Sequence, residues 1–369
     1  MALQKEYTIQ VFDQDGTTFR KSYSIGDGSL KNSPSFSSQI NGGYGQCELD
    51  LDVPFDSFSE GSGVDFMNIV KIYAVDQTNP RGRLIYTGFI SRYEPYIDAQ
   101  SEEGVKVTLL GLVSLLSFSY YKNGSTYAVT HSAVDPETIG RAVIDHFNTI
   151  YGGSLLSYSG DTTDPVGASV SFVFTDQKWI DSIKKTGELA GTDWWWKIDE
   201  TGKYWIKAKP STATHVFTIG RDIQSIRATK DSEKVVNDIQ VRRSGGTTTD
   251  YSDATSQVTY GTGGSGKRTK IISDTSITDA TTANQRGNKE IADFKDSKIK
   301  ASVTVNNKYD IESVKVGETC RIQAYDKSNT FFGTNMFISS INYSADSIRI
   351  ELEQQAQSFG KELDQFVNG

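Results

Sequence analysis

The stretch from Asp176 to Lys209 constrains the fold of this chain most, because it contains all five tryptophans. Its first half predicts a helix. Apolar or small residues lie one helical turn apart on one stripe: Trp179, Ile183, Gly187 and Ala190. Asp176 is a suitable N-cap for this helix, and Gly191 suits the left-handed position that often follows a helix.

The second half of this stretch predicts a β-hairpin. The runs Trp194–Ile198 and Tyr204–Ala208 flank the turn Asp199–Gly202. A type I turn with Gly202 in the left-handed conformation pairs Asp199 with Lys203. The register then pairs three further positions: Ile198 with Tyr204, Trp196 with Ile206, and Trp194 with Ala208.

These three pairs lie on one face of the hairpin, and we expect that face to pack under the helix. The other face carries two tryptophans and two lysines: Trp195, Lys197, Trp205 and Lys207. These four residues form the candidate interaction surface. Either lysine stems half cover its tryptophans, or the rings form a platform for sugars or nucleic-acid bases. Trp195 and Trp205 are expected to be at least partly exposed or at an interface.

Composition excludes several classes of protein. A chain of 369 residues exceeds one ordinary domain. The net charge is −8 and no basic block is present, so the chain is a poor nucleic-acid clamp. Its two cysteines are far apart in sequence, which predicts no disulfide framework and fits folding in the cytoplasm. The most apolar run, 109–118, is too short to cross a bilayer, and the N-terminus has no signal-peptide core.

The β pattern occurs on both sides of a mixed module. Residues 1–116 predict short strands, with a hairpin turn at Asp13–Gly16 and a long loop at 29–45. A helix introduced by Asp135 and Pro136 then opens an α+β module at 117–210. Strands return after Pro210, with a Ser/Thr/Gly-rich loop at 244–266 and a helix at 280–294. The last strands are expected at 299–305, 319–325, 335–343 and 348–352, before a polar helix or tail at 354–369.

No motif matches a catalytic pattern in full. The run Gly261–Arg268 is close to a phosphate-binding loop, but Arg268 replaces the Ser or Thr that binds Mg²⁺ and a strand follows it. The three histidines are not spaced as a metal pair: His131, His146 and His215. His146 is expected at the surface of its helix. The sequence therefore predicts no catalytic, cofactor-binding or metal-binding residue.

Three stretches of the chain carry a resemblance to a known family. The first is the strand pair at 85–90 and 105–111, the second is the helix and tryptophan hairpin, and the third is 316–320 with the closing hairpin at 335–353. Together they resemble the tail-hub, or baseplate-hub, proteins of tailed bacteriophages. They are also similar to the hub half of type VI secretion spike proteins.

The resemblance implies a mainly β fold with two related β-barrel domains and an inserted α+β domain. The first barrel would comprise residues 1–116 and 211–243, and the inserted domain residues 117–210. The second barrel would comprise residues 244–353, followed by the tail at 354–369. Three copies would form a ring in which six barrels give pseudo-sixfold symmetry.

The function implied is structural. Such a ring joins a sixfold tail tube to a threefold tip or spike and surrounds the DNA channel. The expected partners are the tail tube or distal tail protein and a tip, spike or fibre protein, and a contact with the tape-measure protein is allowed. Sequence-specific binding of nucleic acid and stable insertion into a membrane are not expected. No cofactor is expected either. The location implied is the tail tip of the virion, after synthesis and assembly in the host cytoplasm.

Two alternatives belong to other classes. The chain could be a stand-alone carbohydrate-binding protein that uses Trp195 and Trp205, or a tail-associated cell-wall hydrolase. Because no catalytic motif is present, a non-enzymatic role is favoured.

Overall fold

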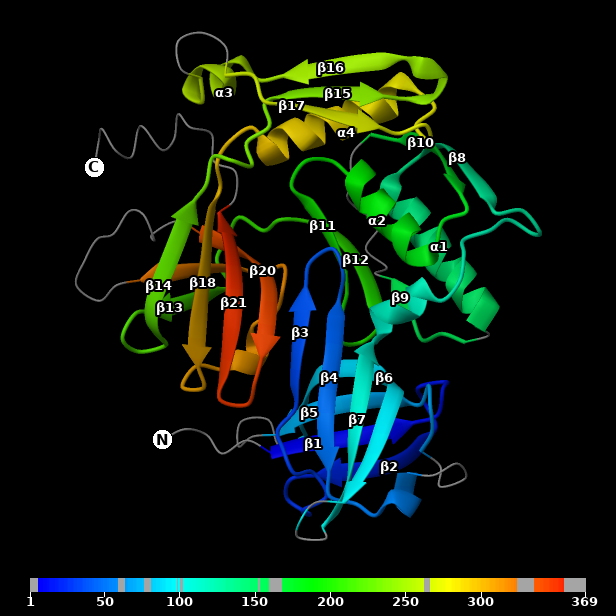
Figure 1. Cartoon of the computed structure of the whole chain (residues 1–369), viewed down its shortest axis with the longest axis vertical. Coiled ribbons are helices and arrows are strands. Elements are labelled where there is room, and N and C mark those ends of the chain that lie inside the picture. The colour runs from blue at the N-terminus through cyan, green and yellow to red at the C-terminus, as the bar shows by residue number, and fades with distance from the viewer. Residues whose placement is uncertain are drawn as a thin grey trace.

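The computed structural model describes residues 6–58, 64–75, 81–97, 99, 102–151, 153–158, 168–261, 266–323 and 335–354. Two β-barrels lie side by side, and a middle domain with most of the helices covers one end of both (Figure 1). The fold is mainly β with an α+β insertion, which confirms the fold class predicted from the sequence.

The first barrel is formed by the N-terminal strands. They are β1 (Glu6–Phe12), β2 (Phe19–Ser24), β3 (Ser35–Gln39), β4 (Tyr44–Leu51), β5 (Ile69–Val75), β6 (Arg83–Ile97) and β7 (Glu103–Gly111), with the short helix η1 (Phe55–Phe58). Alternation explains why they form strands: in β4, Cys47, Leu49 and Leu51 are buried, while the residues between them are not. The turn predicted at Asp13–Gly16 joins β1 to β2, with Gly16 at a φ of 71°.

The second barrel is built from two separate parts of the chain. Its elements are β13 (His215–Thr218), β14 (Ile223–Lys230), β18 (Ile299–Asn306), η4 (Ile311–Ser313), β19 (Thr319–Gln323), β20 (Asn335–Tyr343) and β21 (Ser347–Gln354). β13 pairs with β19 and β14 pairs with β18. The prediction that residues 211–243 complete the first barrel is therefore wrong. Alternation identified strands here, but it carries no information on which strands are their neighbours.

The two barrels share one topology. The first contains the order β3-β4-β7-β6-β5 and the second contains β14-β18-β21-β20-β19. Every neighbouring pair in both series is antiparallel. The corresponding strands also follow each other in the same chain order. The prediction of two related barrels is thus confirmed in the strand connections.

The middle domain contains two chain segments rather than the single insertion 117–210. The first comprises η2 (Leu112–Ser117), β8 (Ala128–Val134), α1 (Pro136–Tyr151), β9 (Ser157–Tyr158), β10 (Val170–Thr175), α2 (Trp179–Leu189), β11 (Trp194–Ile198) and β12 (Lys203–Ala208). The second comprises β15 (Asp238–Arg242), η3 (Ser244–Gly246), β16 (Thr248–Ser252), α3 (Ala254–Thr259), β17 (Thr269–Ser273) and α4 (Ala280–Phe294). Buried side chains of both segments belong to one apolar core.

Two predicted loops contain regular structure. The loop expected at 29–45 includes β3, and the loop expected at 244–266 includes β16 and α3, while residues 262–265 lie outside the described structure. Both strands are polar, with the sequences SFSSQ and TTDYS. Because neighbouring strands supply their hydrogen bonds, they do not need a strong apolar pattern. The tail predicted after residue 354 also lies outside the described residues.

Helix ends differ from the prediction around the tryptophan stretch. The N-cap of α2 is Lys178 with no side-chain cap, and Asp176 has a positive φ of 51°. The helix ends at Leu189, its C-cap Ala190 is extended, and the glycines with positive φ do not include Gly191. The α2 ends are instead fixed by packing, since Trp179 and Leu189 are fully buried.

Candidate functional site: the junction of two barrels and the tryptophan hairpin

The tryptophan hairpin forms in the predicted register. β11 pairs with β12 through Ile198 and Tyr204, Trp196 and Ile206, and Trp194 and Ala208. Gly202 has a φ of 79°, as the type I turn requires. Four of these six side chains are buried: Ile198, Tyr204, Trp196 and Ile206. Trp194 is half-buried and Ala208 is exposed at the open end of the hairpin.

The second face of the hairpin is divided between two environments. Trp195 is only 4% exposed, because its ring packs against Phe337 of β20 and over the backbone of Gly317. The Lys197 ammonium donates to the carbonyl of Val316 at 3.1 Å, and burial lowers the pKa of Lys197. The prediction that Trp195 is partly exposed is therefore wrong, because the second barrel covers its ring. The interface that the prediction allowed lies within the chain.

Trp205 and Lys207 stay at the surface of the protein. Trp205 is half-buried and Lys207 is exposed. The Lys207 ammonium lies 3.6 Å from the centre of the Trp205 ring and the Lys203 ammonium lies 4.6 Å from it. The indole also donates to Asp199 at 2.6 Å. These contacts favour the covered arrangement over an open stacking platform, and an interaction surface at Trp205 and Lys207 stays a prediction.

The hairpin also binds the first barrel through backbone hydrogen bonds. The turn between β3 and β4 lies along β11: the Asn41 amide donates to the Trp196 carbonyl at 2.7 Å, and the Ile198 amide donates to the Gly42 carbonyl at 2.9 Å. Asn41 Oδ1 accepts from the Trp196 amide at 3.2 Å. The hairpin therefore contacts the first barrel with its edge and the second barrel with its face.

Glu200 in the hairpin turn connects all three bodies. Its carboxylate accepts from the Tyr44 hydroxyl at 3.1 Å and pairs with the Lys315 ammonium at 3.1 Å. Its carbonyl accepts from Thr87 at 2.5 Å. The sequence pattern indicated only a turn at Glu200, because nothing local distinguishes a turn carboxylate that reaches two distant barrels.

The two barrels meet directly beside the hairpin. Residues 36–39 of β3 pair with residues 340–343 of β20 in antiparallel register, so one sheet runs through both barrels. The Phe36 ring stacks on Tyr343 with centroids 4.8 Å apart. The Tyr343 hydroxyl contacts the Tyr7 hydroxyl at 2.9 Å and donates to Glu312 at 2.6 Å. This strand-edge contact is called the internal junction below.

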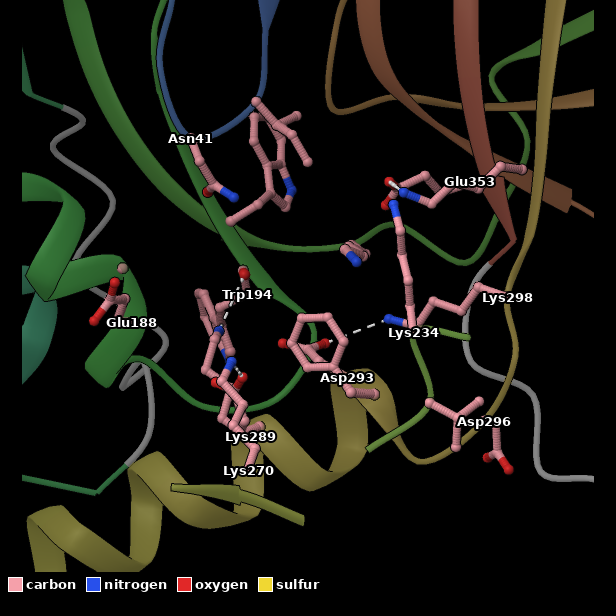
Figure 2. Close-up of a pocket in the computed structure, with 18 of the residues that line it drawn as sticks. Asn41, Glu188, Trp194, Lys234, Lys270, Lys289, Asp293, Asp296, Lys298 and Glu353 are labelled. Atoms are coloured by element: carbon pink, nitrogen blue, oxygen red, sulfur yellow. Dashed lines mark hydrogen bonds and ion pairs between the residues drawn. The ribbon is translucent and has the colours of Figure 1, made fainter. Parts of the chain in front are cut away.

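A pocket of about 720 Å³ opens where the hairpin, α2, α4 and the second barrel meet. Figure 2 shows charged side chains from several elements around it, among them Glu188 of α2, Asp293 of α4 and Glu353 of β21. Many of these charges are already paired, such as Lys300 with Glu353 at 3.2 Å. The Lys289 ammonium donates to the Gly191 carbonyl at 2.9 Å, and burial lowers its pKa. The pocket is thus lined by charged groups that already have partners within the second barrel or within the middle domain.

The histidines do not gather at this junction. The His146 ring accepts from the Trp179 indole at 2.8 Å and is half-buried, so it supports the core rather than standing free at the surface. His215 contacts Glu318 at 2.8 Å and Tyr309 at 3.0 Å in the second barrel. Within the described ranges, no group of three metal-ligating side chains occurs. Cys47 and Cys320 are free and buried in different barrels.

A search for helices that could span a membrane found no candidate of sufficient length and apolarity among the described residues.

Among known proteins, only solved structures match this chain. No protein-family model and no curated protein matches the sequence. Among solved structures, the 43 kDa tail protein of prophage MuSo2 from Shewanella oneidensis aligns with a TM-score of 0.61 and 13% identity, over 95% of this chain and 98% of that protein. The tail protein from Neisseria meningitidis MC58 aligns with a TM-score of 0.62 and 10% identity, over 94% and 96%.

A secretion protein shares the fold as well. The E. coli c3393 protein, a component of the type VI secretion system, aligns with a TM-score of 0.51 and 8% identity, over 90% of this chain and 74% of that protein. The chain therefore has the fold of phage tail proteins and of a type VI secretion component, which confirms the predicted resemblance. At these identities the likeness concerns the fold.

Proposed function

We propose that this chain is a structural hub of a bacteriophage tail tip. Three copies form a ring that joins the sixfold tail tube to the threefold tip or spike and surrounds the DNA channel. The observation that carries the proposal is the pair of barrels with one topology, fused edge to edge in one chain. Three such chains present six similar barrels, which is what a ring between sixfold and threefold partners requires.

The contacts of the internal junction support a structural role for the pairing of the two barrels. It combines strand pairing, stacked aromatic rings and buried hydroxyl contacts. The Arg83–Asp310 ion pair at 2.9 Å adds a further contact between the barrels. These contacts join residues of the first barrel to residues of the second. In this proposal the two barrels therefore behave as a single rigid unit.

The partners follow from this role. One end of the ring contacts the tail tube or the distal tail protein, and the other end contacts a tip, spike or fibre protein. The tape-measure protein is a further candidate within the channel. The net charge of −8 suits a channel that lets DNA pass without binding it.

The location can be tested on tailed particles from the cell that makes this protein. We expect an antibody raised against the purified chain to label the distal end of the tail in electron micrographs. Label on the capsid or along the tail shaft, or its absence from intact particles, would contradict the proposal.

The proposed role involves no catalysis by this chain. The purified protein is expected to leave host cell wall intact in a zymogram in which a known cell-wall hydrolase produces clearing. Clearing by the purified chain, abolished by heating it, would support the hydrolase alternative instead.

A further inference from the structure

The two barrels repeat each other residue by residue around one β-bulge. In β6 the bulge lies at Ser91, between Ile90 and Arg92, and in β20 it lies at Ser339, between Ile338 and Ser340. Each bulge serine donates to the facing strand. Ser91 reaches the Thr108 carbonyl at 3.0 Å, and Ser339 reaches the Glu351 carbonyl at 3.1 Å. The two bulges align β6 with β20.

The turn before the next strand repeats in the same way. The Met67 amide donates to Ile90, and the Gly317 amide donates to Ile338, each at 2.9 Å. Met67 and Gly317 both have positive φ, 66° and 85°. The next residue in each turn, Asn68 or Glu318, accepts through its side chain from the amide three positions before it. This agreement fixes the correspondence between the two barrels.

The correspondence shows which surfaces should be equivalent to those of the internal junction. Residues 340–343 of β20 correspond to residues 92–95 of β6. Phe36 of β3 and Ala228 of β14 face corresponding residues, Cys47 of β4 and Ala301 of β18. Counted along the strands from that pair, residues 36–39 correspond to residues 228–231, and the register shift after Phe36 gives β4 one extra residue that β18 lacks. The internal junction uses β3 and β20. The equivalent strands, β14 and β6, do not pair with each other within one chain.

Within the described residues, each segment pairs with another strand along one edge only. β5 pairs with β6 only up to Phe89, and β14 pairs with β18 along one edge. Arg92, Glu94 and Thr229 are exposed. In Figure 1, β14 and β6 lie at opposite outer sides of the molecule, with β3 and β20 between them. One chain cannot join them, but a second copy can.

We infer that the end of β14 in one copy adds antiparallel to residues 92–95 of β6 in the next copy. This inference rests on the proposed ring and names the surface that closes it. The internal register transfers directly: Arg92 faces Asp231, Tyr93 faces Lys230, Glu94 faces Thr229, and Pro95 faces Ala228. Pro95 cannot donate a hydrogen bond, so the ladder ends there, as the internal junction ends at Tyr343.

Charge supports this register independently of the repeat. Arg92 and Asp231 carry opposite charges and stand directly opposite each other, where cross-strand pairs attract. Arg92 now pairs with Glu94 on its own strand, and both side chains are at least half exposed. An exposed pair of this kind costs little to rearrange. Asp231 is partly exposed, and its carboxylate accepts from the Glu233 amide at 2.8 Å.

Disulfide trapping tests the register. The full-length Arg92→Cys/Asp231→Cys protein is oxidised in a glutathione buffer at high concentration. Opposite Cα atoms in an antiparallel pair lie about 4.5–5.5 Å apart, within the reach of a disulfide. We expect cross-linked dimers and trimers, with no larger products. Cys47 and Cys320 are buried and remain in every variant.

Two matched variants control this experiment. Gln39→Cys/Ser340→Cys lies at the corresponding pair of the internal junction and should form a disulfide within one chain. Arg92→Cys/Arg227→Cys moves one cysteine four residues along β14 and should cross-link about tenfold less, because the thiols are out of register. Equal intermolecular cross-linking by this variant and by the 92/231 pair would contradict the inference.

Charge reversal gives a second measurement. Arg92→Asp and Asp231→Arg each place like charges opposite each other and should weaken association by about fivefold per junction. The double reversal restores the attraction and should recover the wild-type oligomer in native mass spectrometry. A wild-type trimer that neither single reversal weakens would overturn this surface while leaving the proposed ring intact. A chain that shows neither a trimer nor any 92/231 cross-link at any concentration would contradict both.

Discussion

Trp196 lies where the hairpin, helix α2 and the first barrel meet. Its ring is 1% exposed and packs against Gly187 of α2, where any side chain would collide with the indole. Its backbone bonds to Asn41 in the turn of the first barrel. A single residue therefore couples the core of the middle domain to the site at which the barrels join.

Replacing Trp196 with alanine is expected to lower the free energy of unfolding by about 3–5 kcal/mol, because it opens a large cavity in a packed core. Denaturant titration followed by circular dichroism measures this change. Trp205→Ala is the matched control, since Trp205 is half-buried on the other face of the same hairpin. Equal losses in the two variants would contradict the assignment of the faces.

Residue patterns predicted the hairpin well and its surroundings poorly. Alternation and Gly202 were enough for the register, because both are local properties of the stretch. Trp195 has the same local pattern as Trp205, yet it is covered by Phe337 and Gly317, which lie more than a hundred residues further along the chain. Local sequence cannot distinguish a covered face from an exposed one when the cover is that distant.

At the scale of elements, the middle domain depends on contacts between its two chain segments. The Lys185 ammonium of α2 pairs with the Asp274 carboxylate, which follows β17. Burial raises the pKa of Asp274, but hydrogen bonds from Lys185 and Ser276 outweigh it and hold the pKa below its ordinary value. Asp274 is 8% exposed, so this pair is shielded from solvent.

This ion pair should make stability depend on pH. Because the folded pKa of Asp274 is depressed, its contribution is present above the unfolded pKa, about 4, and is lost as the pH falls through the folded pKa. At pH 7 we expect Asp274→Asn to lower stability by about 1–3 kcal/mol, since it removes one of the two carboxylates, Asp274 and Glu188, that pair with the half-buried Lys185 ammonium. The difference from wild type should shrink as the pH falls below about 4.

Urea titrations of both proteins between pH 7 and pH 3 measure this dependence. Asp250→Asn is a suitable control, because Asp250 is exposed on β16 of the same domain. A stability difference for Asp274→Asn that stays constant over the whole range would show that the carboxylate does not act through its charge.

The elements themselves were largely predictable, whereas their partners were not. The helix expected at 280–294 and the strand expected at 335–343 occur at those residues. β14 was assigned to the wrong barrel, because an alternating strand fits any sheet with a matching free edge. β3, the polar strand of the internal junction, was predicted as loop, since its hydrogen-bonding partners rather than its side chains make it a strand.

At the scale of the whole molecule, the chain contains two copies of one barrel joined edge to edge. Open strand edges invite uncontrolled association, and a closed ring removes them. The internal junction covers one such edge within the chain. The equivalent edges at β6 and β14 remain at opposite sides of the molecule, which suits head-to-tail assembly (Figure 1).

A reconstruction of the native tail tip tests the ring most directly. We predict three copies of this chain in one ring, with first and second barrels alternating around the channel and β14 of each copy beside β6 of the next. Six copies in the ring, or one copy on the axis, would contradict the proposed symmetry adapter.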